Sequence, residues 1–148
     1  MTTRGRWHPW RHLARYHPDV VVEFANLEDG LLGYTDLAAG RIVLNRQLTQ
    51  CERRCTLTHE LHHVHRGRVP ADPDLRDHEE RVVDRIAARQ LVTLEDLVQA
   101  LLWSTDHHEV ADELWVDADT LRTRLDDLED SERSAIAARL NDAPQWSA

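Results

Sequence analysis

The sequence predicts an α+β fold, in which a small three-stranded antiparallel sheet packs on a helical bundle. Two observations predict it. Three short apolar runs, each ended by a turn signal, fall within the first 45 residues, and from residue 49 onward apolar residues recur at helical spacing. The 148 residues suffice for one domain with a core of its own. We therefore expect a single compact domain with its strands first and most of its helices afterwards.

The elements before residue 46 are one short helix and three strands. Pro9 suits the first turn of a helix that runs to Tyr16. Strands are expected at 19–24, 31–35 and 41–45, separated by the turn signals Asp29-Gly30 and Ala38-Ala39-Gly40. Since a sheet edge can hold an extended peptide by strand addition, the third strand is our candidate for a peptide-binding edge.

The next helix carries the motif H-E-x-x-H. Thr49 and Glu52 form a predicted capping box at its start, and Gly67 closes it. His59 and His63 are four residues apart, so both imidazoles lie on one helix face and can bind one divalent ion. Glu60 cannot reach that ion from its position, but it can reach a water molecule there and act as a general base.

A third metal ligand has to come from another element. The following helix, expected over roughly 77–88, begins with Glu79 and Glu80 and continues with apolar residues at helical spacing. Acidic residues in a first helical turn are commonly surface residues that favour the helix dipole. The alternative is that one of the two turns inward and completes a His₂Glu site, the ligand set of several zinc peptidases.

Most of the chain resembles the ImmA/IrrE-type zinc metallopeptidases of phages, mobile elements and bacteria. The resemblance rests on Gly33-Tyr34-Thr35-Asp36, Arg41-Ile42-Val43-Leu44, the run 52–57 leading into His59-Glu60-Leu61-His62-His63, and the run 80–87, similar to E-x-x-A-[ND]-x-F-A. It implies His59 and His63 as ligands of Zn²⁺, with Mn²⁺ the alternative ion, Glu60 as the base and Glu80 as third ligand. The sequence departs from the pattern at His62, where a small residue is usual, and at Val83 and Ile86.

Helical spacing bears on the choice between Glu80 and its neighbours. Glu80 falls on one face with Val83 and Ala87, which should pack toward the metal helix. Glu79 lies over Val83 and Ile86, so a modest rotation of the helix would substitute it for Glu80. Asp84 is one turn past Glu80, and its shorter side chain better suits a hydrogen bond to one of the ligands.

Other residues near the motif have weaker claims. Cys51 and Cys55 have no second cysteine pair for a zinc site, so we expect reduced, mostly buried thiols. Cys55 is one helical turn before His59; packing is its favoured role, and lining the metal pocket is the alternative. Tyr34, His65 and His78 are candidates to donate a hydrogen bond to a developing oxyanion. His62 is a further candidate for the surroundings of the site.

The C-terminal part is expected to be helical, with helices after Thr93, a pair resembling a helix-turn-helix within 106–128, and a short helix at about 131–140. Trp115 stands where the turn of such a pair usually has glycine. From Asp106 to Glu132 there are eleven acidic residues and two arginines, a balance that disfavours binding to phosphates. We expect residues 1–92 to form a metallopeptidase-like catalytic part and residues 93–148 a helical part packed on it.

The net charge of −9 disfavours nucleic acid as a general partner. The N-terminus shows no secretory signal pattern and no stretch is long and apolar enough for a membrane span, so we expect a cytoplasmic protein with no membrane partner. The leading prediction is a zinc-dependent endopeptidase, and the resemblance implies a protein substrate such as a helix-turn-helix repressor of a phage or mobile element. The alternatives are a metal-containing protein-binding regulator with little turnover and a DNA-binding regulator acting through residues 106–128.

Overall fold

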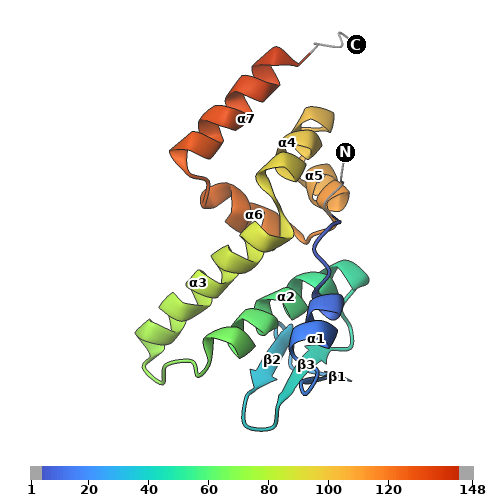
Figure 1. Ribbon diagram of the computed structural model, residues 1–148, viewed down its shortest axis with the longest axis vertical. Helices are drawn as coiled ribbons and strands as arrows, with labels where there is room; N and C mark the ends of the chain where they lie inside the picture. The colour runs from blue at the N-terminus through green and yellow to red at the C-terminus, as the bar shows by residue number, and fades with distance from the viewer. Residues whose placement is uncertain (1–4, 144–148) are drawn as a thin grey trace.

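The computed structural model describes residues 5–143 and has the predicted α+β class. In Figure 1 the sheet, α1 and α2 form the lower part, α4 to α7 the upper part, and α3 extends between them. The elements in chain order are α1 (Pro9–Tyr16), β1 (Val21–Ala25), β2 (Gly33–Asp36), β3 (Arg41–Asn45), α2 (Gln50–Arg66), α3 (Pro73–Leu91), α4 (Leu94–Trp103), α5 (His107–Leu114), α6 (Ala118–Asp126) and α7 (Asp130–Asp142).

The sheet is mixed, so the prediction of a purely antiparallel sheet was wrong. Its strand order is β1-β3-β2: β2 and β3 form an antiparallel hairpin, whereas β1 pairs with β3 in parallel. The seven residues between β1 and β2 let the chain cross over, so that β3 lies in the middle of the sheet and its Ile42, Val43 and Leu44 are buried. The expected peptide-binding edge is also corrected, because β3 is central and β2 is an edge strand.

Helix α2 is built as its sequence predicts. The Thr49 hydroxyl accepts from the backbone N–H of Glu52, and the Glu52 carboxylate accepts from the N–H of Thr49, which completes the capping box. Such a cap stabilises a helix by about 1 kcal/mol. At the other end Gly67 has φ of +89°, a conformation that glycine adopts without strain, and its N–H bonds to the carbonyl of His63.

Two apolar clusters hold the molecule together. One lies between the sheet, α1 and α2 and contains Leu44, Leu57 and Leu61; the other lies among α4 to α7 and reaches Cys55 on α2 and Leu91 at the end of α3. Trp7 packs against both clusters, and its indole N–H donates to the Thr58 hydroxyl, one residue before His59. The metal-motif helix therefore has one flank in each cluster, which fixes its position.

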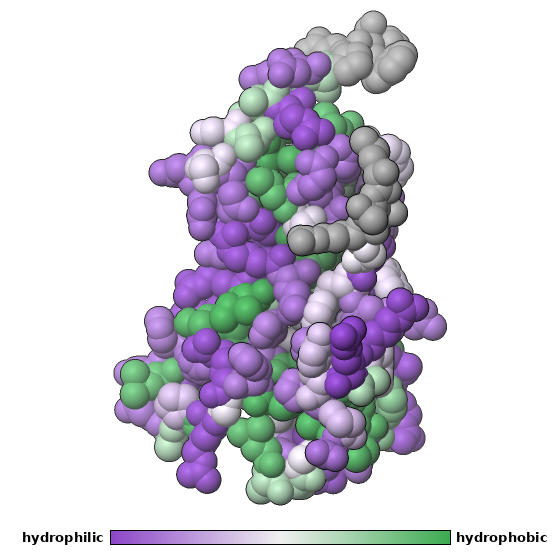
Figure 2. All heavy atoms as spheres, in the orientation of Figure 1, coloured by the Kyte–Doolittle hydropathy of each residue, from purple (hydrophilic) through white to green (hydrophobic). Residues whose placement is uncertain are grey.

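The C-terminal helices include the predicted helix-turn-helix-like pair, α5 and α6. Trp115 occupies the turn in the left-handed conformation (φ +55°), and the Arg54 guanidinium lies 5.3 Å from its ring centre. Helix α6 packs on α3, and α7 packs on α4. In the view of Figure 2 the outer surface is mostly hydrophilic, with apolar side chains gathered between α7 and α4.

Among the described residues, no helix is both long enough and apolar enough to cross a membrane.

Candidate metal centre

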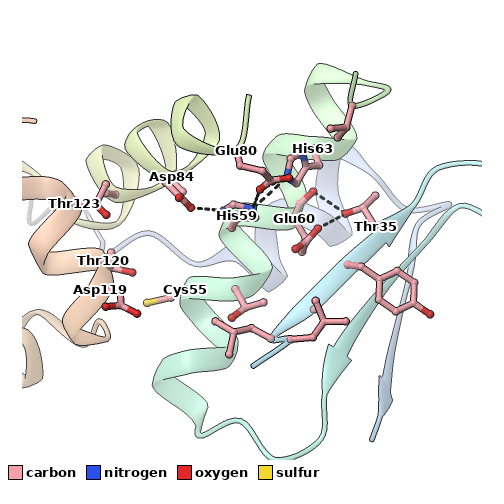
Figure 3. A pocket seen from close by; sticks show the side chains of 18 of the residues that line it. Thr35, Cys55, His59, Glu60, His63, Glu80, Asp84, Asp119, Thr120 and Thr123 are labelled. Atoms are coloured by element: carbon pink, nitrogen blue, oxygen red, sulfur yellow. Dashed lines mark hydrogen bonds and ion pairs between the residues drawn. The ribbon is translucent and has the colours of Figure 1, made fainter. Parts of the chain in front are cut away.

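A cleft of about 1050 Å³ runs along the exposed flank of α2. Its walls are α3 on one side and the edge strand β2 on the other, and the first turns of α6 close one end (Figure 3). His59, Glu60 and His63 project from α2 into this cleft, as the helical spacing of the motif requires. The motif therefore lies at the floor of this cleft.

Three side chains converge at the floor of the cleft. The Nε2 atoms of His59 and His63 are 3.1 Å apart, and the Oε2 atom of Glu80 is 3.0 Å from the first and 3.2 Å from the second. Ligands of a tetrahedral ion with bonds of about 2.0–2.1 Å lie about 3.3 Å apart. Within residues 5–143, these three form the group whose donor atoms are close enough to share one ion. The donor set and its spacing fit a divalent metal such as Zn²⁺.

The two other acidic candidates occupy different positions. Glu79 is not part of the cluster and forms an ion pair with Arg66, whose NH2 group is 3.0 Å from Oε2. Asp84 lies one turn beyond Glu80, and its Oδ1 atom is 2.9 Å from Nδ1 of His59. This contact orients the His59 ring so that Nε2 faces Glu80. His63 has no matching support among residues 5–143, since its buried Nδ1 atom has no hydrogen-bond partner there.

The acidic surroundings affect the protonation of His59. Burial by itself would lower its pKa, but the hydrogen bond with Asp84 and the charges of Glu60, Asp84 and Glu80 outweigh burial and raise the pKa above its ordinary value. Negative charge thus surrounds the point where the imidazoles meet. A cation at that point would be stabilised by the same charges.

Glu60 is buried, with 5% of its surface exposed, and is held by a residue that sequence reasoning missed. The Thr35 hydroxyl, on β2, donates to Oε2 of Glu60 at 2.6 Å and lies 3.3 Å from its backbone carbonyl oxygen. The only sequence signal for Thr35 was its place in the segment 33–36 that supported the family resemblance. Spacing could not place Thr35 beside α2.

Gly33 explains how β2 comes so close to α2. A Cβ atom on Gly33 would lie 2.8 Å from the carbonyl oxygen of Val43 and 3.0 Å from Cγ2 of Thr56. Any larger residue would push the strand away from the helix or from β3. The glycine therefore allows the approach that brings Thr35 to Glu60.

The remaining candidates are distributed inside and outside the cleft. Tyr34 and Cys55 line it, Tyr34 at the exposed edge strand and Cys55 with only 5% of its surface exposed. His62 does not face it: its Nε2 atom lies 2.6 Å from Oε1 of Gln90, so it links α2 to α3, and burial lowers its pKa. His65 and His78 are exposed and do not line it.

The comparisons with known proteins gave one finding. Searches of curated proteins and of solved structures gave no significant match. The M78 peptidase model, described as the IrrE N-terminal-like domain, matches residues 15–126, which include β1 to β3, the motif helix, α3 and the pair α5–α6. The match covers about three quarters of the chain and contains every residue of the cluster. The chain therefore belongs to the M78 peptidase family, that of the IrrE N-terminal-like domain.

Proposed function

We propose that this protein is a zinc-dependent endopeptidase in which His59, His63 and Glu80 hold the ion. One observation carries the proposal: three side chains with metal-binding atoms converge at the floor of a cleft, directly beside the buried carboxylate of Glu60. A structural zinc site closes its fourth position with a protein ligand, whereas a catalytic site leaves it open. Here three donors face an open cleft, which supports a catalytic site.

The ion would polarise the scissile carbonyl and make a nearby water more acidic. Glu60 takes the proton of the attacking water on its carboxylate and passes it to the amine that leaves. Thr35 holds that carboxylate at one oxygen, so the other oxygen stays available for the proton. Asp84 keeps the His59 ring in the orientation that its role as a ligand requires.

The edge strand β2 supports the binding of a peptide in extended form. One side of β2 pairs with β3, which leaves the other side for strand addition along the cleft. Leu31, Leu32 and Leu37 flank the strand, line the cleft and are each more than 40% exposed. Exposed leucines in a cleft favour a substrate segment with apolar side chains.

The family implies a protein as substrate. We propose a helix-turn-helix repressor of a phage or mobile element, on the strength of the resemblance to the ImmA/IrrE peptidases. The residues of the cleft do not by themselves select this partner. The same cluster would also suit a metal-containing regulator that binds its partner without cutting it, and the following experiment separates the two.

The Glu60→Gln variant tests the proposal. An amide cannot accept the proton of water, so cleavage of a co-purifying or co-encoded repressor should fall at least about 100-fold while bound zinc stays at one per chain. Mass spectrometry measures cleavage, and elemental analysis measures bound metal. The matched control is Glu95→Gln, the same substitution at an exposed residue that pairs with Arg139. Cleavage by Glu60→Gln at the wild-type rate would exclude Glu60 as the base. If the wild type and Glu60→Gln both bind zinc, and the wild type cleaves none of the partners that it binds, the regulator is the favoured function.

A further inference from the structure

Past the metal cluster, the cleft has an end portion that lies against α6. Its lining residues come from three helices, and we refer to them together as the α6 pocket: Cys55 of α2; Ala87, Ala88 and Leu91 of α3; and Thr120 and Thr123 of α6. Figure 3 shows Thr120 beside the Cys55 side chain and Thr123 farther along α6, on the same side of His59 as Asp84. The pocket therefore adjoins the place where the scissile bond would lie.

The floor of the α6 pocket is apolar and made of small side chains. Cys55, Ala87, Ala88 and Leu91 are each at most 5% exposed, and two of these four are alanines. The pKa of the Cys55 thiol is raised, first by its hydrogen bond with Cys51 and then by burial. The thiol is thus held neutral, and the pocket offers methyl groups and a neutral sulfur to a side chain that enters.

The charged residues near the α6 pocket lie at its rim or are already paired. Asp119 and Arg122 have side chains 88% and 71% exposed and lie 3.6 Å from each other. The Asp117 carboxylate caps α6 by accepting from the backbone N–H of Thr120 at 2.8 Å. Asp84, on the same side of His59, contacts Nδ1 of that histidine. Each of these charged groups already has a partner, so the pocket offers no free counter-charge to a charged side chain.

We propose that the α6 pocket receives one apolar side chain of the substrate next to the scissile bond, and that α6 is the specificity wall of the cleft. The inference rests on the proposed function, because it presupposes a peptide across the metal cluster. Lining a peptide cleft is a role for the helix-turn-helix-like pair that is compatible with its excess of acidic residues. The helix that would read DNA in such a pair instead packs on α3 and closes the peptide cleft.

Hydroxamates on zinc-loaded protein test the pocket without requiring turnover. Each probe carries one side chain, that of glycine, alanine, leucine, phenylalanine, aspartate or arginine. Two series are made, which place this side chain on opposite sides of the chelating hydroxamate. In one series the leucine or phenylalanine probe should bind wild type at least about 10-fold tighter than the glycine probe. Thr123→Trp, which fills the pocket from its rim, should remove this preference and leave the affinity for the glycine probe and the zinc content unchanged.

Two further variants keep the test decisive. Thr123→Asp, of nearly the same size as the wild-type residue, replaces the tryptophan variant if that variant folds poorly. It should weaken the binding of the leucine probe about 10-fold. Ser134→Trp places the same bulk on an exposed face of α7 outside the cleft and should change nothing. A wild-type protein that binds all probes equally, or that prefers a charged one, would overturn the pocket while leaving the metal centre intact. Failure of every probe to bind would instead remove the metal centre, and the pocket with it.

Discussion

Thr35 illustrates how one side chain can set the geometry of a proposed base. Its hydroxyl donates to the Glu60 carboxylate at 2.6 Å from a different element, while the helix alone fixes only the backbone of Glu60. A hydrogen bond to a charged group contributes roughly 1.5–3 kcal/mol. Loss of this bond would allow the carboxylate to turn away from the water that it deprotonates.

We therefore predict that Thr35→Val lowers kcat about 10-fold while KM and zinc content stay near wild-type values. Valine has the shape of threonine without the hydroxyl, so the packing of β2 is kept. Thr35→Ser, which restores a hydroxyl, should recover most of the activity. Steady-state kinetics with elemental analysis check this, and an unchanged kcat in Thr35→Val would show that Thr35 has no positioning role.

The sequence could tell which residues share one face of a helix. The spacing of His59 and His63 follows from the helical period, and the helical face of Glu80 favoured it over Glu79; in the structure Glu80 lies at the two histidines and Glu79 pairs with Arg66. Thr35 could not be placed, because its contact depends on how β2 docks on α2. Local periodicity carries no information about contacts between elements that lie far apart in the chain.

At the scale of elements, the strands were placed to within two residues at each end, but their pairing was not. Alternation of apolar residues tells which faces of a strand are buried, not which strand lies beside it. The hairpin of β2 and β3 follows from the turn at 37–40, whereas the parallel pairing of β1 with β3 depends on the longer connection between β1 and β2. The consequence for the site is that β2, not β3, borders the cleft.

A buried ion pair links α6 to α7. Arg124 is 2% exposed; its guanidinium donates to the carbonyl of Val92 and, at 2.8 Å, to Glu132. The hydrogen bond from Arg124, with further ones from the Glu129 N–H and Arg89, lowers the pKa of Glu132 from its ordinary value near 4.5 to about 2. Because the folded state holds Glu132 ionised, this pair stabilises the fold fully above pH 4.5, and the stabilisation is lost as the pH falls toward 2.

The Glu132→Gln variant should therefore unfold more easily at neutral pH, by about 2 kcal/mol, since a buried arginine loses its counter-charge. The difference from wild type should shrink below pH 4.5 and vanish below pH 2, where Glu132 is itself mostly protonated. Urea unfolding across this pH range measures it. Glu95→Gln, which breaks an exposed ion pair with Arg139, is the control and should have little effect. An equal loss of stability at every pH would show that Glu132 does not stabilise the fold through its charge.

At the scale of the whole molecule, α6 lines the cleft, and the charge of the pair α5–α6 disfavours a DNA-binding surface. Two arginines lie between residues 106 and 132. Arg124 is buried and forms an ion pair with Glu132, and Arg122 is paired with Asp119. Eleven acidic residues surround them, and α6 packs on α3. A recognition helix needs unpaired cations to neutralise phosphates, whereas both arginines of α6 are paired with acidic residues.

We predict no binding of duplex DNA by the full chain at physiological salt, measured by fluorescence anisotropy with a duplex spanning the upstream region of its own gene. Arg122→Glu should leave that result unchanged. Binding below about 1 μM that weakens with salt and disappears in Arg122→Glu would contradict this and support the DNA-binding alternative.

The central claim is that His59, His63 and Glu80 form one metal centre, and the affinity of variants for zinc tests it most directly. Glu79 and Glu80 are adjacent acids on α3, so Glu79→Ala is a matched control for Glu80→Ala. Competition with a chromophoric chelator should give one zinc per wild-type chain, at least about 100-fold weaker binding in Glu80→Ala, and near wild-type binding in Glu79→Ala. Equal affinities in the two variants, or greater loss in Glu79→Ala, would contradict the account.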